Sequence, residues 1–154
     1  MINPSQIVMR FMMMPGADMC GFLDSNIVLY AFGDDEIKSR IANRLLVEYP
    51  CISTQVVNEC SHVMRRKLGW KPDKIAEELE MLLVVVRLQP VDIRHIRLAW
   101  KISARYGFSH FDSLIVATAL EARCERLYSE DMQNGQIIEN RLQIVNPFLN
   151  IIPS

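Results

Sequence analysis

Short, mostly apolar runs alternate with longer segments of helical periodicity, and this alternation is the feature that most restricts the fold of the chain. The runs lie at residues 20–23, 51–53, 84–88, 126–128 and 142–145. Short apolar strands between amphipathic helices are typical of a parallel sheet that is covered on both faces. The pattern therefore predicts an α/β fold in three α/β/α layers, with a central parallel sheet of four or five strands.

Between the runs, apolar residues recur at spacings of three and four, as they do along one face of a helix. Pro72 stands where a helix tolerates proline, in its first turn, and Gly107 follows the last periodic residue of another helix. In sheets of this kind, ligands bind beyond the carboxyl ends of the strands, where the strand order switches. Residues that follow the strands are therefore the first candidates for a functional site.

Acidic residues stand at strand ends or near helix starts at four places in the chain. Asp24 comes directly after the first run, and Asp131 lies three residues after the fourth. Glu59 falls in the first turns of the helix after the second run, and Asp112 falls in the first turn of its own helix. All four are therefore expected at the same edge of the sheet.

Each of these acids also has an ordinary structural role, which is the stronger interpretation when the acid is taken singly. Asp24 can cap a helix, and Asp112 can pair with a Ser109 cap or favour the helix dipole. Asp131 can lie in a turn, and Glu59 can be solvated. Taken together the four favour a shared site, because unrelated acids would be scattered over both ends of the sheet.

A convergence of carboxylates without lysine or arginine has a chemical consequence. The charges repel one another, and some carboxylates take up protons unless a cation neutralises them. Mg²⁺ is typically held by a few carboxylates, by waters and by the phosphates of a substrate, whereas zinc prefers nitrogen and sulfur ligands. The four acids therefore predict one or two Mg²⁺ or Mn²⁺ ions that activate water against a phosphodiester.

The charge balance excludes a global attraction to nucleic acid or to an anionic membrane, because 17 Lys and Arg against 18 Asp and Glu leave a formal charge of −1. Contact with nucleic acid would need a local basic patch. Two helical faces are basic and could meet RNA phosphates, but we favour their interpretation as solvated surfaces. One carries Arg65, Arg66, Lys67 and Lys71, and the other carries Arg94, Arg97, Lys101 and Arg105.

The chain of 154 residues fits one domain with a substantial core. Its methionine-rich start is interrupted by Arg10, whereas a secretory signal needs a longer apolar stretch. The longest apolar run, 81–86, is far shorter than the roughly 20 residues of a membrane helix. We therefore expect a cytoplasmic protein without membrane contact, in which residues 1–18 form a dispensable extension and residues 19–154 form the folded domain.

The cysteines and glycines of this chain form none of the sequence motifs that mark metal, redox or nucleotide sites. No two of the four cysteines, Cys20, Cys51, Cys60 and Cys124, form a C-x-x-C pair. We therefore interpret them as small buried residues in a reducing compartment. None of the glycines belongs to a phosphate-binding loop, so ATP and dinucleotide binding have no support.

Four segments of the chain resemble the motifs of PIN-domain nucleases, in the same order and with matching spacing over residues 20–146. They are 22–27 (FLDSNI), 53–59 (STQVVNE), 111–119 (FDSLIVATA) and 128–135 (YSEDMQNG), and the last two are the most specific. Within that family the chain is most similar to VapC-like toxins of toxin–antitoxin pairs.

The resemblance implies a set of site residues. Asp24, Glu59, Asp112 and Asp131 would hold Mg²⁺ or Mn²⁺ and cleave RNA, with Glu59 and Asp112 both open as the proton acceptor. Supporting hydrogen bonds within the site would come from two further residues, Ser129 and Asn26. Glu130, the neighbour of Asp131, is interpreted as pointing away from the site.

The resemblance also implies a biological role and partners. The RNA substrate in this family is often transfer or ribosomal RNA, and the toxins typically form homodimers. A cognate antitoxin silences them by placing its tail in the acidic site. The expected function is therefore that of a metal-dependent endoribonuclease toxin. The alternatives are a housekeeping RNA-processing nuclease and a non-catalytic PIN scaffold.

Overall fold

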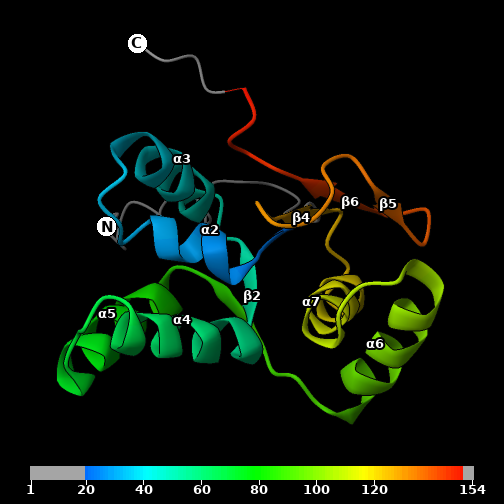
Figure 1. Ribbon diagram of the computed structural model, residues 1–154, viewed down its shortest axis with the longest axis horizontal. Coiled ribbons are helices and arrows are strands. Elements are labelled where there is room, and N and C mark those ends of the chain that lie inside the picture. The colour runs from blue at the N-terminus through cyan, green and yellow to red at the C-terminus, as the bar shows by residue number, and fades with distance from the viewer. Residues whose placement is uncertain (1–19, 151–154) are drawn as a thin grey trace.

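The computed structural model describes residues 20–150, so the expected extension at 1–18 lies outside the described residues. Figure 1 shows the helices and strands. In chain order they are β1 (Gly21–Leu23), α2 (Ser25–Tyr30), α3 (Glu36–Val47), β2 (Cys51–Ser53), α4 (Thr54–Arg66), α5 (Pro72–Val84), β3 (Arg87–Gln89), α6 (Ile93–Tyr106), α7 (His110–Glu121), β4 (Arg126–Tyr128), β5 (Ile137–Ile138) and β6 (Leu142–Val145).

The described strands form one sheet in the order β3-β2-β1-β4-β6-β5. All neighbours are parallel except β5, which runs antiparallel to β6 at the edge. The predicted α/β class with a central, mostly parallel sheet is confirmed. The sheet has six strands rather than four or five, because β5 has only two residues and leaves no apolar run to recognise.

The third strand lies further along the chain than its sequence pattern predicted. Val84 is the last residue of α5, and β3 covers Arg87–Gln89 instead of 84–88. Val85 and Val86 are buried in the core without belonging to a strand. The strand prediction was displaced because β-branched residues favour a packed environment more than a particular backbone conformation.

The helices cover the sheet in two groups (Figure 1). The chain steps outward from β1 to β2 and β3, so right-handed crossovers place α2 to α5 on one face. It then returns across the sheet to β4, which places α6 and α7 on the other face. Contacts of α4 with α2 and α5, and of α6 with α7, agree with this division. Fully buried Phe22, Ile52 and Leu127 lie on the sheet between the two groups.

The most buried helix is α7, in which every residue from 113 to 120 is buried. A helix that is apolar on all sides belongs in a protein core or in a membrane. With 12 residues α7 is too short to cross a bilayer. None of the helices within residues 20–150, α7 included, is long and apolar enough to span a membrane.

The switch in strand order falls between β1 and β4. The chain leaves β1 toward β2 on one side and reaches β4, on the other side, only after β3. The carboxyl ends of these two neighbouring strands are Leu23 and Tyr128, which are register partners. The residues directly after them therefore lie side by side at the place where such sheets bind ligands.

Candidate active site

Asp24 lies at the centre of this crevice. It caps α2 in an extended conformation, and its backbone N–H donates to the carbonyl of Tyr128 at 3.0 Å. One carboxylate oxygen accepts the Ser25 backbone N–H at 2.8 Å, and the other accepts the Ser129 hydroxyl at 2.8 Å. The helix-cap role is therefore present, and in addition the carboxylate is buried beside β4.

Glu59 is half-buried on α4 and is held by two donors. The Ser25 hydroxyl donates to one carboxylate oxygen at 2.6 Å, and the Gln55 side-chain amide donates to the other at 2.7 Å. The same Gln55 amide also donates to the carbonyl of Phe111 at 3.1 Å. Glu59 is thus positioned between α2 and the start of α7, and it is not an ordinary solvated helix charge.

Asp112 enters from the first turn of α7. Its backbone N–H donates to the hydroxyl of Ser109 at 3.2 Å, so the predicted serine cap is present. The Asp112 side chain is half-buried. Burial raises its pKa, the Ser109 contact lowers it, and the charges of Asp131 and Glu59 raise it further. Asp112 therefore lies close to both of these acids.

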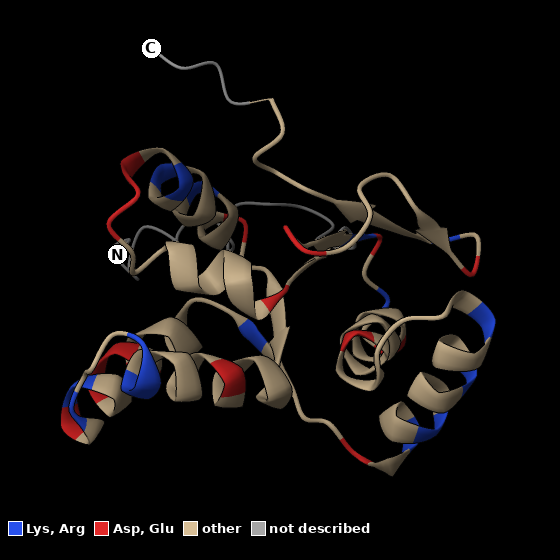
Figure 2. Ribbon diagram, viewed as in Figure 1, with Lys and Arg blue, Asp and Glu red and all other residues tan. Residues whose placement is uncertain are grey.

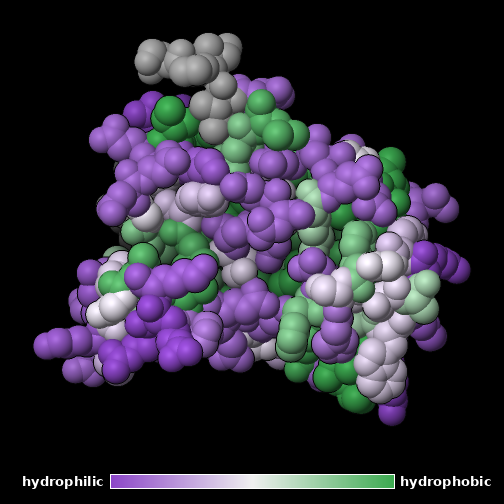
Figure 3. Space-filling view, viewed as in Figure 1, coloured by the Kyte–Doolittle hydropathy of each residue, from purple (hydrophilic) through white to green (hydrophobic). Residues whose placement is uncertain are grey.

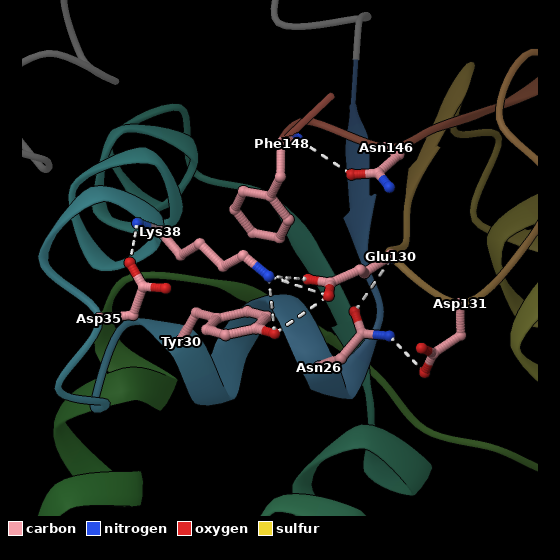
Figure 4. A network of polar contacts seen from close by, with 8 residues as sticks. All are labelled: Asn26, Tyr30, Asp35, Lys38, Glu130, Asp131, Asn146 and Phe148. Atoms are coloured by element: carbon pink, nitrogen blue, oxygen red, sulfur yellow. Dashed lines mark hydrogen bonds and ion pairs between the residues drawn. The ribbon is translucent and has the colours of Figure 1, made fainter. Parts of the chain in front are cut away.

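Asp131 is exposed in the loop after β4 and is held in place by Asn26 on α2. The Asn26 amide donates to an Asp131 carboxylate oxygen at 2.9 Å (Figure 4). The Asn26 side-chain oxygen accepts the Glu130 backbone N–H at 3.4 Å. One side chain of α2 thus contacts two consecutive residues of this loop.

Glu130 faces α3, as Figure 4 shows, and not its neighbour Asp131. Its carboxylate accepts the Lys38 ammonium at 2.9 and 3.0 Å and the Tyr30 hydroxyl at 3.1 Å. These contacts raise the pKa of Lys38. The interpretation that Glu130 points away from the site is confirmed, and Lys38 neutralises Glu130 instead of the acid cluster.

The electrostatics of Asp24 link it to two of the other acids, Glu59 and Asp112. Burial raises the pKa of Asp24 to about 6, and the charges of Glu59 and Asp112 act in the same direction. The hydrogen bonds from Ser129 and Ser25 oppose this effect. Within residues 20–150, no lysine or arginine forms an ion pair with any of the four acids. The cluster therefore carries uncompensated negative charge, as its sequence positions predicted.

The donor set of the cluster fits a hard divalent cation. Every candidate ligand atom is a carboxylate oxygen, which Mg²⁺ and Mn²⁺ prefer. Among the described residues, no three of these carboxylates approach one another within 4.8 Å. The carboxylates are therefore not gathered tightly enough for three of them to contact one ion directly without adjustment. Such spacing suits a cation that keeps part of its water shell, as Mg²⁺ usually does.

A groove of about 630 Å³ opens beside Glu59. Its walls come from the starts of α2 and α7, from most of the length of α4 and from the segment before α6. They combine polar with apolar side chains: Ser25, Thr54, Gln55, Asn58, Glu59, His62, Val63, Val91 and Phe111. The Phe111 side chain is 65% exposed. On the face shown in Figure 3, hydrophilic residues occupy the middle, and apolar residues reach the surface over α6 and α7.

Sequence reasoning missed the groove and two of the residues that hold Glu59, namely Ser25 and Gln55. Gln55 precedes Glu59 by four residues on one helix, a spacing that brings side chains together. That spacing is a usable signal, although it recurs in every helix. The contact of Ser25 with Glu59 joins residues 34 positions apart and has no local signature.

The basic helix faces agree with their interpretation as solvated surfaces. In Figure 2 the acidic positions before α2, on α4 and on α7 lie around the middle of the view, and the basic positions of α6 line its outer side. On α6, Arg94 pairs with Asp92 and Arg105 pairs with Glu139, and both arginines are exposed. At the end of α4, Arg65 donates to the carbonyl of Trp70.

Comparisons with known proteins agree with this architecture. A family model described as "PIN domain" matches residues 21–134. No curated protein sequence matches the chain. Similar solved structures include VapC20 of Mycobacterium tuberculosis, described as a sarcin-ricin loop cleaving toxin, at 19% identity, covering 72% of this chain and 89% of that chain with a TM-score of 0.59.

Two further similar structures contain antitoxins or DNA. A toxin–antitoxin complex from Klebsiella pneumoniae is 20% identical, covers 82% of this chain and 97% of that chain, and has a TM-score of 0.62. DNA-bound VapBC from Salmonella typhimurium is 17% identical, covers 82% of this chain and 98% of that chain, and has a TM-score of 0.60. At these identities the similarity shows the fold.

Proposed function

The chain belongs to the PIN domain family, and on that premise we propose that it is a metal-dependent endoribonuclease of the toxin type. The observation that carries this proposal is the cluster of four carboxylates at the switch in strand order, without an ion-pair partner within residues 20–150. Uncompensated acids at this place cost stability, and such a cost is typical of a functional site.

In this proposal Asp24, Glu59, Asp112 and Asp131 hold Mg²⁺ or Mn²⁺, directly or through water. The bound ion would supply water activation and stabilise the charge that develops on the phosphodiester. Ser129 orients the Asp24 carboxylate through its hydroxyl, and Asn26 positions Asp131. These contacts fix ligand directions, which is the usual role of groups that hold metal ligands in place.

The geometry also favours one of the two candidate proton acceptors. Both carboxylate oxygens of Glu59 are engaged by protein donors, the Ser25 hydroxyl at 2.6 Å and the Gln55 amide at 2.7 Å. The pKa of Asp112 is raised by burial despite the opposing Ser109 contact. We therefore assign the proton acceptor to Asp112, because catalytic bases work best with a pKa near the working pH.

RNA is the substrate that fits the surroundings of the acids. The groove beside Glu59 has a volume of about 630 Å³, within the range of about 300 to 1,000 Å³ that small ligands occupy in protein pockets. Its exposed Phe111 ring offers a surface on which an unpaired base can stack, as single-stranded nucleic acids commonly do. Transfer and ribosomal RNA, with their unpaired loops, are the proposed targets.

The test is cleavage of total cellular RNA by the purified chain with Mg²⁺ or Mn²⁺ and with EDTA. We expect discrete fragments that form only with the metal. The cleavage rate of Asp112→Asn should be at least about 100-fold lower, since replacing residues that merely orient metal ligands already lowers activity about 10- to 100-fold. Asp34→Asn, an exposed acid between α2 and α3, is the matched control and should cleave normally. Truncation of residues 1–18 in the same assay tests whether that extension is dispensable.

Two outcomes would contradict the nuclease. Fragments that persist in EDTA would exclude metal-dependent cleavage, and full activity of Asp112→Asn would remove this acid from the chemistry. Absence of any cleavage, together with no Mn²⁺ binding in a calorimetric titration, would favour the non-catalytic scaffold.

A cognate antitoxin is the proposed protein partner, and a homodimer is the proposed assembly. The similar structures from Klebsiella pneumoniae and Salmonella typhimurium are toxin–antitoxin assemblies. We expect expression of the chain alone to arrest growth and co-expression of an adjoining small gene to relieve the arrest, with Asp112→Asn harmless throughout. Harmless expression of a protein that cleaves RNA in vitro would favour the housekeeping nuclease, and sedimentation of the purified chain tests the dimer.

A further inference from the structure

Three of the four cysteines meet at the amino ends of the strands, at the edge of the sheet opposite the acid cluster. Cys20 precedes β1, Cys51 begins β2 and Cys124 lies two residues before β4. Their sulfur atoms all lie within 4.8 Å of one another. The Cys124 thiol donates to the Cys20 sulfur at 2.9 Å. The interpretation of all four cysteines as unrelated core residues was therefore incomplete.

The fourth cysteine shows what an ordinary buried thiol looks like in this protein. Cys60 is fully buried in α4, and its only described polar contact is a 3.9 Å approach to the carbonyl of Ser25. Burial raises its pKa. The other three differ because their sulfurs converge, and because Cys20 is only half-buried and lines a pocket of about 210 Å³. The cluster thus has both a set of donors and a route to solvent.

A cationic side chain stands next to the three sulfurs. Hydrogen bonds from the Cys124 and Cys51 thiols lower the pKa of Cys20, and the charge of the Arg87 guanidinium acts in the same direction against the effect of burial. The pKa values of Cys124 and Cys51 are raised, in Cys124 chiefly by its hydrogen bond to Cys20, while the charge of Arg87 lowers that of Cys51. Arg87 is the first residue of β3, and it is the register partner of Cys51. A cation placed here stabilises thiolates, which are the forms that bind metal ions.

We propose that Cys20, Cys51 and Cys124 form a binding site for one Zn²⁺ ion, with water from the adjoining pocket in the fourth position. Zinc binds thiolate sulfur at about 2.3 Å in a tetrahedral arrangement, which places ligand sulfurs about 3.8 Å apart. The observed convergence within 4.8 Å allows this geometry with small side-chain adjustments.

The charges of the proposed site balance. Three thiols release three protons when they bind the ion, so three thiolates and Zn²⁺ together carry one negative charge. The guanidinium of Arg87 supplies the matching positive charge. A disulfide between Cys20 and Cys124 would leave Cys51 and Arg87 without a function, and it would need a two-electron oxidant. A three-sulfur set beside a cation is better suited to a metal.

The site would join segments that lie far apart in the sequence. Its ligands come from the amino ends of β1, β2 and β4, and Cys20 and Cys124 are 104 residues apart. A ligand that binds the folded state and not the unfolded chain raises stability in proportion to its affinity. Zinc would therefore stabilise the sheet without taking part in the chemistry at the opposite edge.

The test is a titration of the full chain, reduced and freed of metal, with Cd²⁺ as the probe and with excess Mg²⁺ present to occupy the carboxylates. The thiolate-to-cadmium charge-transfer absorption in the ultraviolet reports sulfur ligation alone, so the result does not depend on whether the protein cleaves RNA. We expect the band to saturate at one Cd²⁺ per chain and to disappear when Zn²⁺ is added.

Substitutions identify the ligands. Cys20→Ser, at the half-buried position, should weaken Cd²⁺ binding at least about tenfold, whereas the matched control Cys60→Ser should leave the band unchanged. Zn²⁺ should also slow alkylation of Cys20 in the unmodified chain, which tests the site without any substitution. Absence of a band in reduced, folded protein would overturn the proposal, and so would a Cys20–Cys124 disulfide that persists in the protein isolated from cells.

Discussion

Replacing Asp24 by asparagine is expected to remove RNA cleavage and, at the same time, to stabilise the fold in the absence of divalent metal. The activity should fall at least about 100-fold, because the asparagine side chain would supply a neutral and weaker ligand in place of a carboxylate. The free energy of unfolding should increase because Asp24 is buried beside two other acids, whose charges oppose its ionisation.

The sign and size of the stability gain follow from the pKa of Asp24. Burial first, and then the neighbouring charges, raise this pKa from 3.8 to about 6. The cost of ionising the buried acid is therefore absent below about pH 4, grows as the pH rises from about 4 to about 6, and reaches about 3 kcal/mol at about pH 8. Asparagine carries no charge at any of these pH values, so the variant escapes this cost.

Asparagine also preserves the local hydrogen bonds. Its side-chain oxygen can accept the Ser25 backbone N–H, and its amide can donate to the Ser129 hydroxyl, which reorients. The melting temperature in EDTA at pH 8 should therefore rise by about 6 to 12 °C, at about 2 to 4 °C per kcal/mol for a chain of this size. At pH 4 the two proteins should melt at nearly the same temperature.

The measurement is thermal unfolding of both proteins with EDTA and with Mn²⁺, with Asp34→Asn as the control. Mn²⁺ should raise the melting temperature of the unmodified chain and of Asp34→Asn, and should have a much smaller effect on the Asp24 variant. If Asp24→Asn melts several degrees lower than the unmodified chain in EDTA at pH 8, Asp24 is a structural cap and not a strained site acid.

Asp24 and Asp131 could be placed from the sequence because they follow strand ends, and Glu59 and Asp112 because they lie near helix starts; both are local features of the sequence. A parallel sheet brings these ends to one edge, so Asp24 after β1 and Asp131 after β4 had to approach each other. The contacts that hold the acids were less accessible to this reasoning. Of these, Ser129 and Asn26 came from the family resemblance, while Ser25 was missed because its partner Glu59 is distant in the sequence.

The cysteine cluster shows a second limit of sequence reasoning. Metal motifs are recognised when ligands are close in sequence, as in C-x-x-C, because one turn then holds two of them. Cys20, Cys51 and Cys124 belong to three separate strand starts and become neighbours only through the order β2-β1-β4. The position of β3 was also decided by tertiary packing. Val85 and Val86 lie in the core without belonging to a strand, so β3 begins later than the apolar run predicted.

The pH dependence of cleavage provides the most discriminating prediction about the metal. At low Mn²⁺ concentration the rate should fall about tenfold per pH unit below about 6, because protons and metal compete for Asp24, whose pKa lies there. More Mn²⁺ should move this fall to lower pH. Ser129→Ala should move it to higher pH, because the Ser129 hydroxyl lowers the pKa of Asp24.

The matched control for Ser129→Ala is Ser61→Ala, whose hydroxyl donates to the carbonyl of Val57 within α4 and not to an acid of the cluster. Its pH profile should coincide with that of the unmodified chain. A fall that does not move with Mn²⁺ would mean that protons do not compete with the metal, and would place the titrating group in the proton-transfer step. In that case Asp112, with its raised pKa and without the two strong donors that hold Glu59, is the acid to substitute next.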